Sequence, residues 1–191
     1  MSTVIVKPAL SDSCKQTVAD IERQVFNDEF GIALSNGRPH TEAATFQLLA
    51  VAGRRNTPIG ALSVVDTTDN DALHRQFGLV FDRGARVARL TRLAVLKDYR
   101  GQGIPLKLML EAYRLCVWPR QFEFTWLTFD AAKAKSCSYC NVLDYQMSTG
   151  VFDAEYGRVR VLLRKEAVEA ATEEAFAAVR EKGMTAAAIP K

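Results

Sequence analysis

The 191-residue chain has few of the side chains that bind metals or carry thiol chemistry, with two histidines and four cysteines. Cys137 and Cys140 form one C-x-x-C pair, and no second pair or neighbouring histidine completes a zinc site. We therefore expect two reduced thiols one helical turn apart and no bound metal. His40 and His74 are isolated in the sequence, and we expect each of them to be a surface or loop residue.

The chain also has little net charge and no long apolar run. Its 25 Lys and Arg residues and 22 Asp and Glu residues leave a net charge of +3, which is too small and too dispersed to predict a nucleic-acid partner. No apolar stretch approaches the roughly 20 residues that a membrane helix needs. The N-terminal sequence MSTVIVKPAL has no signal-peptide pattern. These absences predict a cytoplasmic protein with no membrane span.

What the sequence does contain predicts one domain with a sizeable core, because 48% of its residues are hydrophobic. No internal repeat or linker divides the chain. We assign residues 1–165 to this domain and residues 166–191 to a C-terminal helix and tail packed on it. A helix is expected over 166–182, with Gly183 as its C-cap. This helix could pack on its own domain or on a partner, so the oligomeric state stays open.

Hydrophobic periodicity predicts an alternation of strands and helices. The expected strands cover residues 4–7, 45–52, 59–65, 87–95 and 122–129, with a closing hairpin of 145–151 and 158–164. The expected helices cover residues 13–28, 105–117 and 131–142. Ser13 and Gln16 fit a capping box at the start of the first helix. Residues 31–42 and 66–84 are expected to be connections.

The segment DYRGQGIPLKL, residues 98–108, joins an expected strand to an expected helix. It lacks the glycine spacing of a P-loop and the third glycine of a dinucleotide fingerprint. Gly101 and Gly103 would let successive N–H groups point into one concavity, and Arg100 and the helix dipole would add positive charge. The segment fits a phosphate-binding loop, although an ordinary tight turn fits the loop alone equally well. Pro105 lacks an N–H, and we expect it at the first helical position, where no helical hydrogen bond is lost.

Over residues 4–165, the element order and the sequence LTRLAVLKDYRGQGI resemble the GCN5-related N-acetyltransferase (GNAT) superfamily. Arg100 and Gly103 match its [RQ]-x-x-G-x-[GA] loop, whereas Pro105 departs from it. Gly60 matches a glycine that is usual in the family's third strand. The resemblance implies an α/β (α+β) fold with a mixed, mostly antiparallel sheet of about six to seven strands. It also implies helices on both faces and a splay between the fourth and fifth strands, which are residues 87–95 and 122–129 here.

The resemblance further implies an acyl thioester donor, whose pyrophosphate lies on the loop and whose pantetheine arm lies between the splayed strands. The implied donor-binding residues are Leu93, Val95, Arg100, Gly101, Gln102, Gly103 and Ile104. The Val95 backbone N–H would polarise the thioester carbonyl, because a donor fixed on a strand costs little reorganisation as charge develops. The implied reaction is direct acyl transfer to an amine, without a metal.

Candidate acids and bases follow from the same resemblance. Tyr139 is the nearest match to the tyrosine that protonates the leaving thiolate in many members, although a second alignment places Cys140 there. A tyrosine that merely packs on the fifth strand is the structural alternative. Asp130 and Glu29 are candidate bases, and their alternatives are solvated or capping carboxylates, with water as the base.

Two departures favour an acyl carrier protein as donor. Without the Pro105 N–H, the loop suits the single phosphate of a phosphopantetheine arm better than a diphosphate. The Thr91-Arg92-Leu-Ala-Val95 element, which follows the long 66–84 segment, resembles that of acyl-homoserine-lactone synthases and N-acyl amino acid synthases. The glutamate that those enzymes carry three residues before the arginine is Arg89 here.

Three functions stay open on the sequence. The first is a long-chain N-acyltransferase that moves an acyl group from acyl carrier protein or coenzyme A to a small amine such as an amino acid. The second is an acetyl-coenzyme A-dependent N-acetyltransferase. The third is a non-catalytic module that binds a thioester.

Overall fold

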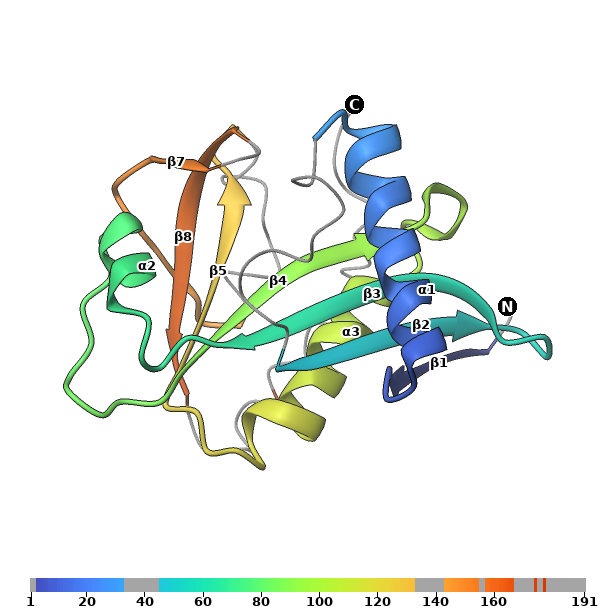
Figure 1. The fold of residues 1–191 in the computed structure, drawn as a ribbon, viewed down its shortest axis with the longest axis horizontal. Coiled ribbons are helices and arrows are strands. Elements are labelled where there is room, and N and C mark those ends of the chain that lie inside the picture. The colour runs from blue at the N-terminus through green and yellow to red at the C-terminus, as the bar shows by residue number, and fades with distance from the viewer. Residues whose placement is uncertain are drawn as a thin grey trace.

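The computed structural model describes residues 3–32, 45–132, 143–154 and 157–166, together with the single residues 174 and 177. Its strands are β1 (Val4–Pro8), β2 (Phe46–Ala52), β3 (Thr57–Asp66), β4 (Val87–Val95), β5 (Phe124–Asp130), β6 (Gln146–Met147), β7 (Phe152–Ala154) and β8 (Gly157–Lys165). Its α-helices are α1 (Asp12–Arg23), α2 (Asp71–Gln76) and α3 (Ile104–Ala112) (Figure 1). Shorter helical turns are η1 (Gln24–Glu29), η3 (Lys97–Tyr99) and η4 (Tyr113–Val117).

The strands of the described residues form one sheet in the order β1-β2-β3-β4-β5-β8-β6, and β7 also pairs with β8. All of these strand pairs are antiparallel except β4 and β5. The expected mixed, mostly antiparallel sheet is confirmed. The closing hairpin differs from the prediction, because two short strands, β6 and β7, replace the single strand expected over 145–151.

The continuous apolar runs of β2 and β3 explain why helices cover both faces of the sheet, as expected. Leu48 and Leu62 belong to the core that contains α3. Leu49, which follows Leu48, and Ala61, which precedes Leu62, belong to the core that contains α1. Successive side chains of a strand point to opposite faces, so both faces of the sheet are apolar and each needs a helix. Figure 1 shows α1 in front of the sheet and α3 behind it.

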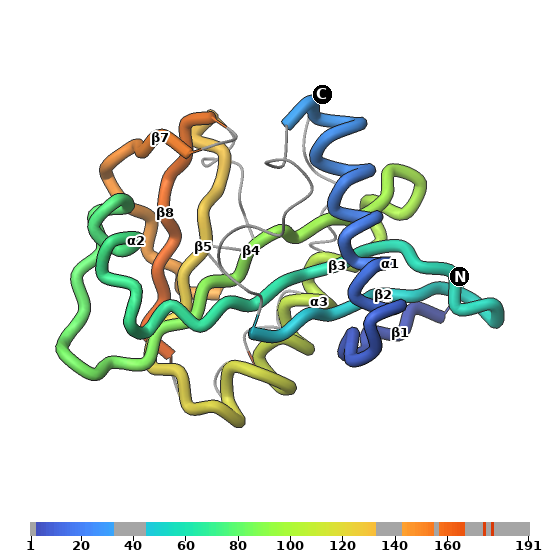
Figure 2. Tube along the Cα trace, in the orientation of Figure 1, coloured from blue at the N-terminus to red at the C-terminus, as the bar shows by residue number. Residues whose placement is uncertain are grey.

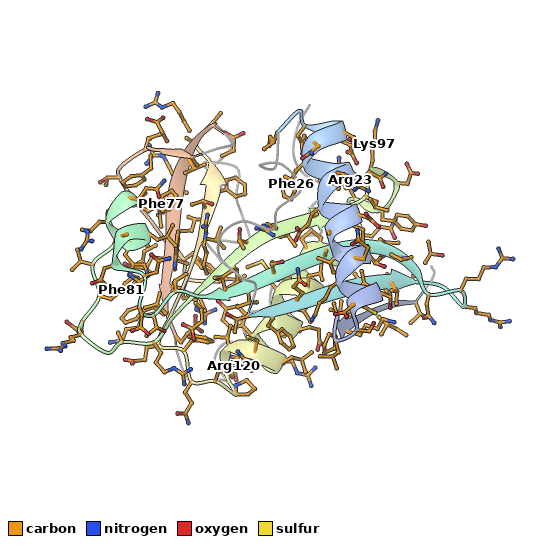
Figure 3. The ribbon with its side chains drawn as sticks, in the orientation of Figure 1. Arg23, Phe26, Phe77, Phe81, Lys97 and Arg120 are labelled. Carbon is orange, nitrogen blue, oxygen red and sulfur yellow. The ribbon has the colours of Figure 1, made fainter. Side chains whose placement is uncertain are left out.

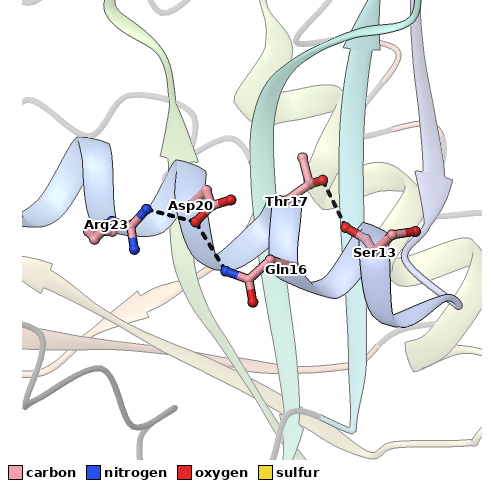
Figure 4. Close-up of polar contacts among 5 residues, drawn as sticks. All are labelled: Ser13, Gln16, Thr17, Asp20 and Arg23. Carbon is pink, nitrogen blue, oxygen red and sulfur yellow. Dashed lines mark hydrogen bonds and ion pairs between the residues drawn. The ribbon is translucent and has the colours of Figure 1, made fainter.

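Helix α1 begins before the expected capping box. Ser11 is the N-cap, and its hydroxyl accepts a hydrogen bond from the Cys14 N–H at 3.2 Å. Gln16 instead donates to Asp20, which also accepts from Arg23 (Figure 4). The capping box was therefore wrong, because the chain enters the helix two residues before Ser13.

Strands β4 and β5 separate soon after they begin, which confirms the expected splay. Their parallel register covers only Val87 to Arg89 on β4, opposite Phe124 to Trp126 on β5. Beyond this point β5 stays paired with β8 over its whole length, while β4 stays paired with β3. The two chain traces diverge toward their C-terminal ends in Figure 2.

Helix α2 lies within the long connection and covers an aromatic cluster beside β5. Phe77 and Phe81 belong to this connection (Figure 3). The centre of the Phe77 ring lies 5.4 Å from that of Trp126 on β5, and the centre of the Phe81 ring lies 5.2 Å from that of Phe124. His74 is buried here, with its Nε2 3.2 Å from the Thr67 hydroxyl oxygen, which also accepts from the Trp126 indole N–H. The expectation of a surface position for His74 was wrong, because the imidazole packs against the rings of Phe81 and Trp126.

Several predictions fall outside the described residues: His40, the C-x-x-C pair, most of 31–42 and 131–142, and nearly all of 166–182. In the part of the chain that is described, no helix is long and apolar enough to cross a membrane.

Candidate active site

The end of β4 directs the Val95 backbone toward the splay. Val95 lies opposite Gly60 of β3, and the neighbouring Leu96 N–H donates to the Ile59 carbonyl at 3.0 Å. Because the polar groups of successive strand residues point to alternate sides, the Val95 N–H and carbonyl point away from β3. This is the side on which β5 diverges, so the Val95 N–H faces the splay, as the resemblance implies.

Gly60 brings β3, β4 and the loop close together at this point. A Cβ atom at Gly60 would lie 3.0 Å from the Ala94 carbonyl oxygen and 3.3 and 3.4 Å from side-chain carbons of Val95 and Ile104. A larger residue would therefore push β4 and the start of α3 apart. The requirement is for close approach, because Gly60 does not have a positive φ.

The loop between β4 and α3 has the backbone geometry of an anion-binding turn. Gly101 and Gly103 have φ angles of 77° and 71°, in the left-handed region that glycine adopts readily. The first backbone bond of α3 runs from the Lys107 N–H to the Gly103 carbonyl, so the N–H groups of Ile104 and Leu106 have no partner within the helix. No side chain caps this helix, and the space beside Gly103 is open. The loop therefore fits a phosphate.

Pro105 is the second residue of α3, one position later than expected. It still lies in the first turn, where no helical hydrogen bond is lost. Its missing N–H leaves a gap between the donors of Ile104 and Leu106. Gln102 extends the loop outward and its side chain donates to the Asp98 carbonyl at 3.5 Å.

The Arg100 side chain is held by protein groups beside the loop. Its Nε donates to the Val95 carbonyl at 2.9 Å, and its Nη2 lies 2.6 Å from a Glu29 carboxylate oxygen. The guanidinium also lies over the Phe30 ring, with its central carbon 5.3 Å from the ring centre. Arg100 thus ties the end of β4 to η1, and 38% of its side chain stays exposed.

This geometry places the predicted acids and bases in different surroundings. Glu29 lies near the end of β4 but is paired with Arg100. Asp130 is exposed at the end of β5, where its carboxylate accepts from the Ala132 N–H at 2.9 Å in a turn. Tyr139 and Cys140 lie outside the described residues. The structure therefore brings Glu29 to the Val95 end of the splay, already engaged in an ion pair.

Both strands of the splay carry apolar side chains on the α3 side of the sheet. Leu93 of β4, Leu127 and Phe129 of β5, and Met147 of β6 are half-buried and pack against the main core. Leu93 belongs to β4, and Leu127 and Phe129 belong to β5, so both diverging strands carry hydrocarbon on this side of the sheet. Such a lining suits the pantetheine arm and an acyl chain better than a charged group.

A buried polar cluster under α1 was not predicted. Glu22 accepts from the Ser63 hydroxyl of β3 at 3.1 Å, and its other oxygen lies 3.4 Å from Nη1 of Arg92 on β4. Only 5% of the Glu22 side chain and 10% of the Arg92 side chain are exposed. Burial raises the pKa of the Glu22 carboxyl, and the Arg92 charge and the Ser63 hydrogen bond oppose that rise.

The sequence did contain one signal for this cluster. Glu22 falls at helical spacing with Val18 and Val25, on the face of α1 that is buried against the sheet. A carboxylate on such a face needs a buried partner. Its partner could not be found from the spacing, because Arg92 lies 70 residues away.

Within the described residues, no group of histidine, cysteine, aspartate and glutamate side chains could hold a metal ion.

No family model and no curated protein matches the sequence, whereas solved structures match the fold. FeeM, an N-acyl amino acid synthase from uncultured soil microbes, is 10% identical, with a TM-score of 0.63 over 86% of this chain and 92% of that chain. An acyl-CoA N-acyltransferase from Pseudomonas aeruginosa is 14% identical, with a TM-score of 0.62 over 86% and 99%. NAA60 from Arabidopsis thaliana, in complex with acetyl-CoA, is 14% identical, with a TM-score of 0.59 over 85% and 98%.

At these identities the likeness speaks for the fold, which agrees with the strand order and the divergence of β4 from β5. The chain has the fold of the GCN5-related N-acetyltransferase superfamily.

Proposed function

We propose that this protein is an N-acyltransferase that moves an acyl group, preferably a long one, from a thioester to the amine of a small molecule such as an amino acid. The observation that carries the proposal is the Val95 N–H, which faces the splay beside a loop fitted for phosphate. A thioester whose phosphate occupied that loop would extend along the splay toward Val95.

In this arrangement the protein's own groups have distinct tasks. The N–H groups of the loop and of the start of α3 hold the phosphate. The Val95 N–H donates to the thioester carbonyl oxygen and stabilises the negative charge that develops there. The apolar walls formed by Leu93, Leu127 and Phe129 exclude water and lower the rate of thioester hydrolysis. The amine attacks the carbonyl carbon, the carbon–sulfur bond breaks, and a proton passes from the amine to the thiolate.

Three observations favour a long acyl chain on acyl carrier protein. The gap that Pro105 leaves among the loop donors matters less for one phosphate than for two. The half-buried hydrocarbon along the splay provides a surface on which an acyl chain can be buried. The similarity to FeeM, an N-acyl amino acid synthase, supports the same choice. Acetyl-coenzyme A is the second candidate donor, supported by the similarity to NAA60.

The test is to incubate the purified protein with palmitoyl-acyl carrier protein, palmitoyl-coenzyme A or acetyl-coenzyme A and a mixture of amino acids. Release of free thiol and formation of the N-acyl product are followed by colour reaction and mass spectrometry. We expect amine-dependent thiol release with the palmitoyl donors. Release with acetyl-coenzyme A alone would establish the second candidate and exclude a long-chain enzyme. No release with any donor would leave a thioester-binding module.

A further inference from the structure

Strand β4 contains a bulge at Arg92, between its short pairing with β5 and the Val95 amide. Ser63 pairs with Thr91 and Ala61 pairs with Ala94, so Leu62 alone lies opposite two residues of β4. Arg92 has a φ of 54°, which is left-handed backbone in the interior of a strand. A residue with a Cβ atom holds this conformation only where its surroundings impose it.

The side chain of Arg92 is largely buried and contacts a carboxylate on α1. The Glu22 carboxylate receives the Arg92 guanidinium on one oxygen and the Ser63 hydroxyl on the other. Ser63 is next to Leu62 on β3, so the Glu22 carboxylate of α1 contacts both β3 and β4 at the bulge. We call this arrangement of Glu22, Ser63 and Arg92 the bulge pin.

The bulge decides which residue of β4 faces the splay. A shift of one residue reverses the side to which every following side chain and N–H points. With the extra residue at Arg92, it is the Val95 N–H that turns away from β3. Without it, the N–H groups of Val95 and Leu96 would exchange sides.

Burial of this ion pair gives little reason to expect a gain in stability. An isosteric apolar pair is often as stable as a buried ion pair, because the charges lose their hydration. Moreover, the Arg92 Nε is buried and has no hydrogen-bond partner in the described structure. The pair of Arg23 and Asp20 on the same helix, in contrast, is largely exposed (Figure 4). A gain in stability therefore does not explain why these charges are buried at the bulge.

We propose that Glu22 and Arg92 are positioning residues, which hold the β4 bulge and thereby aim the Val95 N–H at the thioester carbonyl. This inference rests on the proposed acyl transfer, and it assigns a task to two residues that make no contact with the donor in that scheme. If the inference is right, a glycine at position 92 would adopt the left-handed backbone conformation without the contact between Arg92 and Glu22.

The decisive comparison is between Arg92→Gly and Arg92→Ala, each combined with Glu22→Gln so that no charge is left buried alone. Glycine adopts the left-handed conformation without strain, whereas alanine does not. We expect the glycine double variant to keep kcat within about threefold of the unmodified protein and the alanine double variant to lose about tenfold or more, because a single misdirected oxyanion donor costs on the order of a hundredfold. KM for the amine should change little in either. The control, Arg23→Ala, should leave kcat unchanged.

A second measurement does not depend on acyl transfer. Amide hydrogen exchange at Leu96, whose N–H bonds to Ile59 just beyond the bulge, should be faster in the alanine double variant than in the glycine one. If the unmodified protein transfers no acyl group, the proposed function fails and this exchange comparison alone decides the inference.

Three results would contradict the inference that the bulge pin positions the Val95 N–H. Equal kcat in the glycine and alanine double variants would show that backbone strain at residue 92 is not what the pair controls. A similar rise of amine KM in both would show that Arg92 contacts the acceptor. Equal exchange at Leu96 in both would show that the bulge keeps its geometry unaided.

Discussion

At the scale of single residues, Arg100 connects the two halves of the candidate site. An arginine that binds phosphate is expected to have a free guanidinium. In Arg100, however, Nε donates to the Val95 carbonyl and Nη2 donates to the Glu29 carboxylate. The hydrogen bond to the Val95 carbonyl fixes the end of β4, where the Val95 N–H faces the splay. Arg100 can therefore influence donor binding both through its charge and through the position of the loop.

Replacement of Arg100 by alanine should weaken donor binding, because it removes a positive charge and releases the end of β4. We expect the Kd for coenzyme A and for phosphopantetheine to rise roughly tenfold to a hundredfold, because loss of a hydrogen bond to a charged group costs about 1.5–3 kcal/mol. Calorimetric titration measures both constants. The matched variant Glu29→Gln keeps the Val95 contact and should weaken binding less. Unchanged affinity in Arg100→Ala would contradict a phosphate site at this loop.

At the scale of secondary structure elements, the sequence predicts a strand or helix well where one periodicity continues without interruption. The apolar runs rich in strand-forming residues at 45–52 and 59–65 and the helical spacing of α1 were sufficient for these elements. The prediction of one strand over 145–151 was wrong, because the Ser148 hydroxyl accepts from the Val161 N–H and donates to the Gly150 carbonyl. This side chain takes the place of a strand partner and turns the chain between β6 and β7.

The candidate site divides in the same way. The loop could be predicted because its glycines and arginine are contiguous in sequence, and glycine at 101 and 103 meets a real backbone requirement. The bulge pin could not be predicted, because α1 and β4 meet only in the folded sheet. A bulge also leaves no compositional signal when the residue with positive φ is an arginine.

Helix α3 offers a test of the number of phosphates. Pro105→Ala adds an N–H at the second position of the helix, between the donors of Ile104 and Leu106. One additional hydrogen bond should lower the Kd for coenzyme A about threefold to tenfold. Phosphopantetheine, which has a single phosphate, should bind with nearly unchanged affinity. An equal gain for both ligands, or none for coenzyme A, would remove Pro105 as an argument for a carrier-protein donor.

At the scale of the whole molecule, a buried polar network holds the base of β5 in place. The Tyr113 hydroxyl lies 2.8 Å from the Thr125 hydroxyl and 2.7 Å from that of Tyr145. Glu166, just after β8, accepts from Thr125 and Tyr113, and the Arg164 guanidinium lies over the Tyr113 ring. The network joins η4, β5 and the end of β8 at the end of β5 remote from the open splay. It anchors β5 there, so that its other end can diverge from β4.

Glu166 makes the stability of this network depend on pH. Burial raises the pKa of its carboxyl above the ordinary 4.5, although Thr125 and Arg164 oppose the rise. The folded chain therefore binds the proton more tightly than the unfolded chain does, and this contribution to stability is lost as pH rises from 4.5 through the folded pKa. In Glu166→Gln the loss is absent, so the free energy of unfolding of this variant relative to the unmodified protein should increase with pH above 4.5, by about 1.4 kcal/mol for each unit of pKa shift. Urea unfolding at a series of pH values, followed by tryptophan fluorescence, measures this difference.

Tyr145→Phe is the control, because burial raises the pKa of Tyr145 to about 12 and removal of its hydroxyl should cost about 1 kcal/mol at every pH tested. A constant offset between Glu166→Gln and the unmodified protein over this range would show that the carboxyl is not held at a raised pKa by the fold.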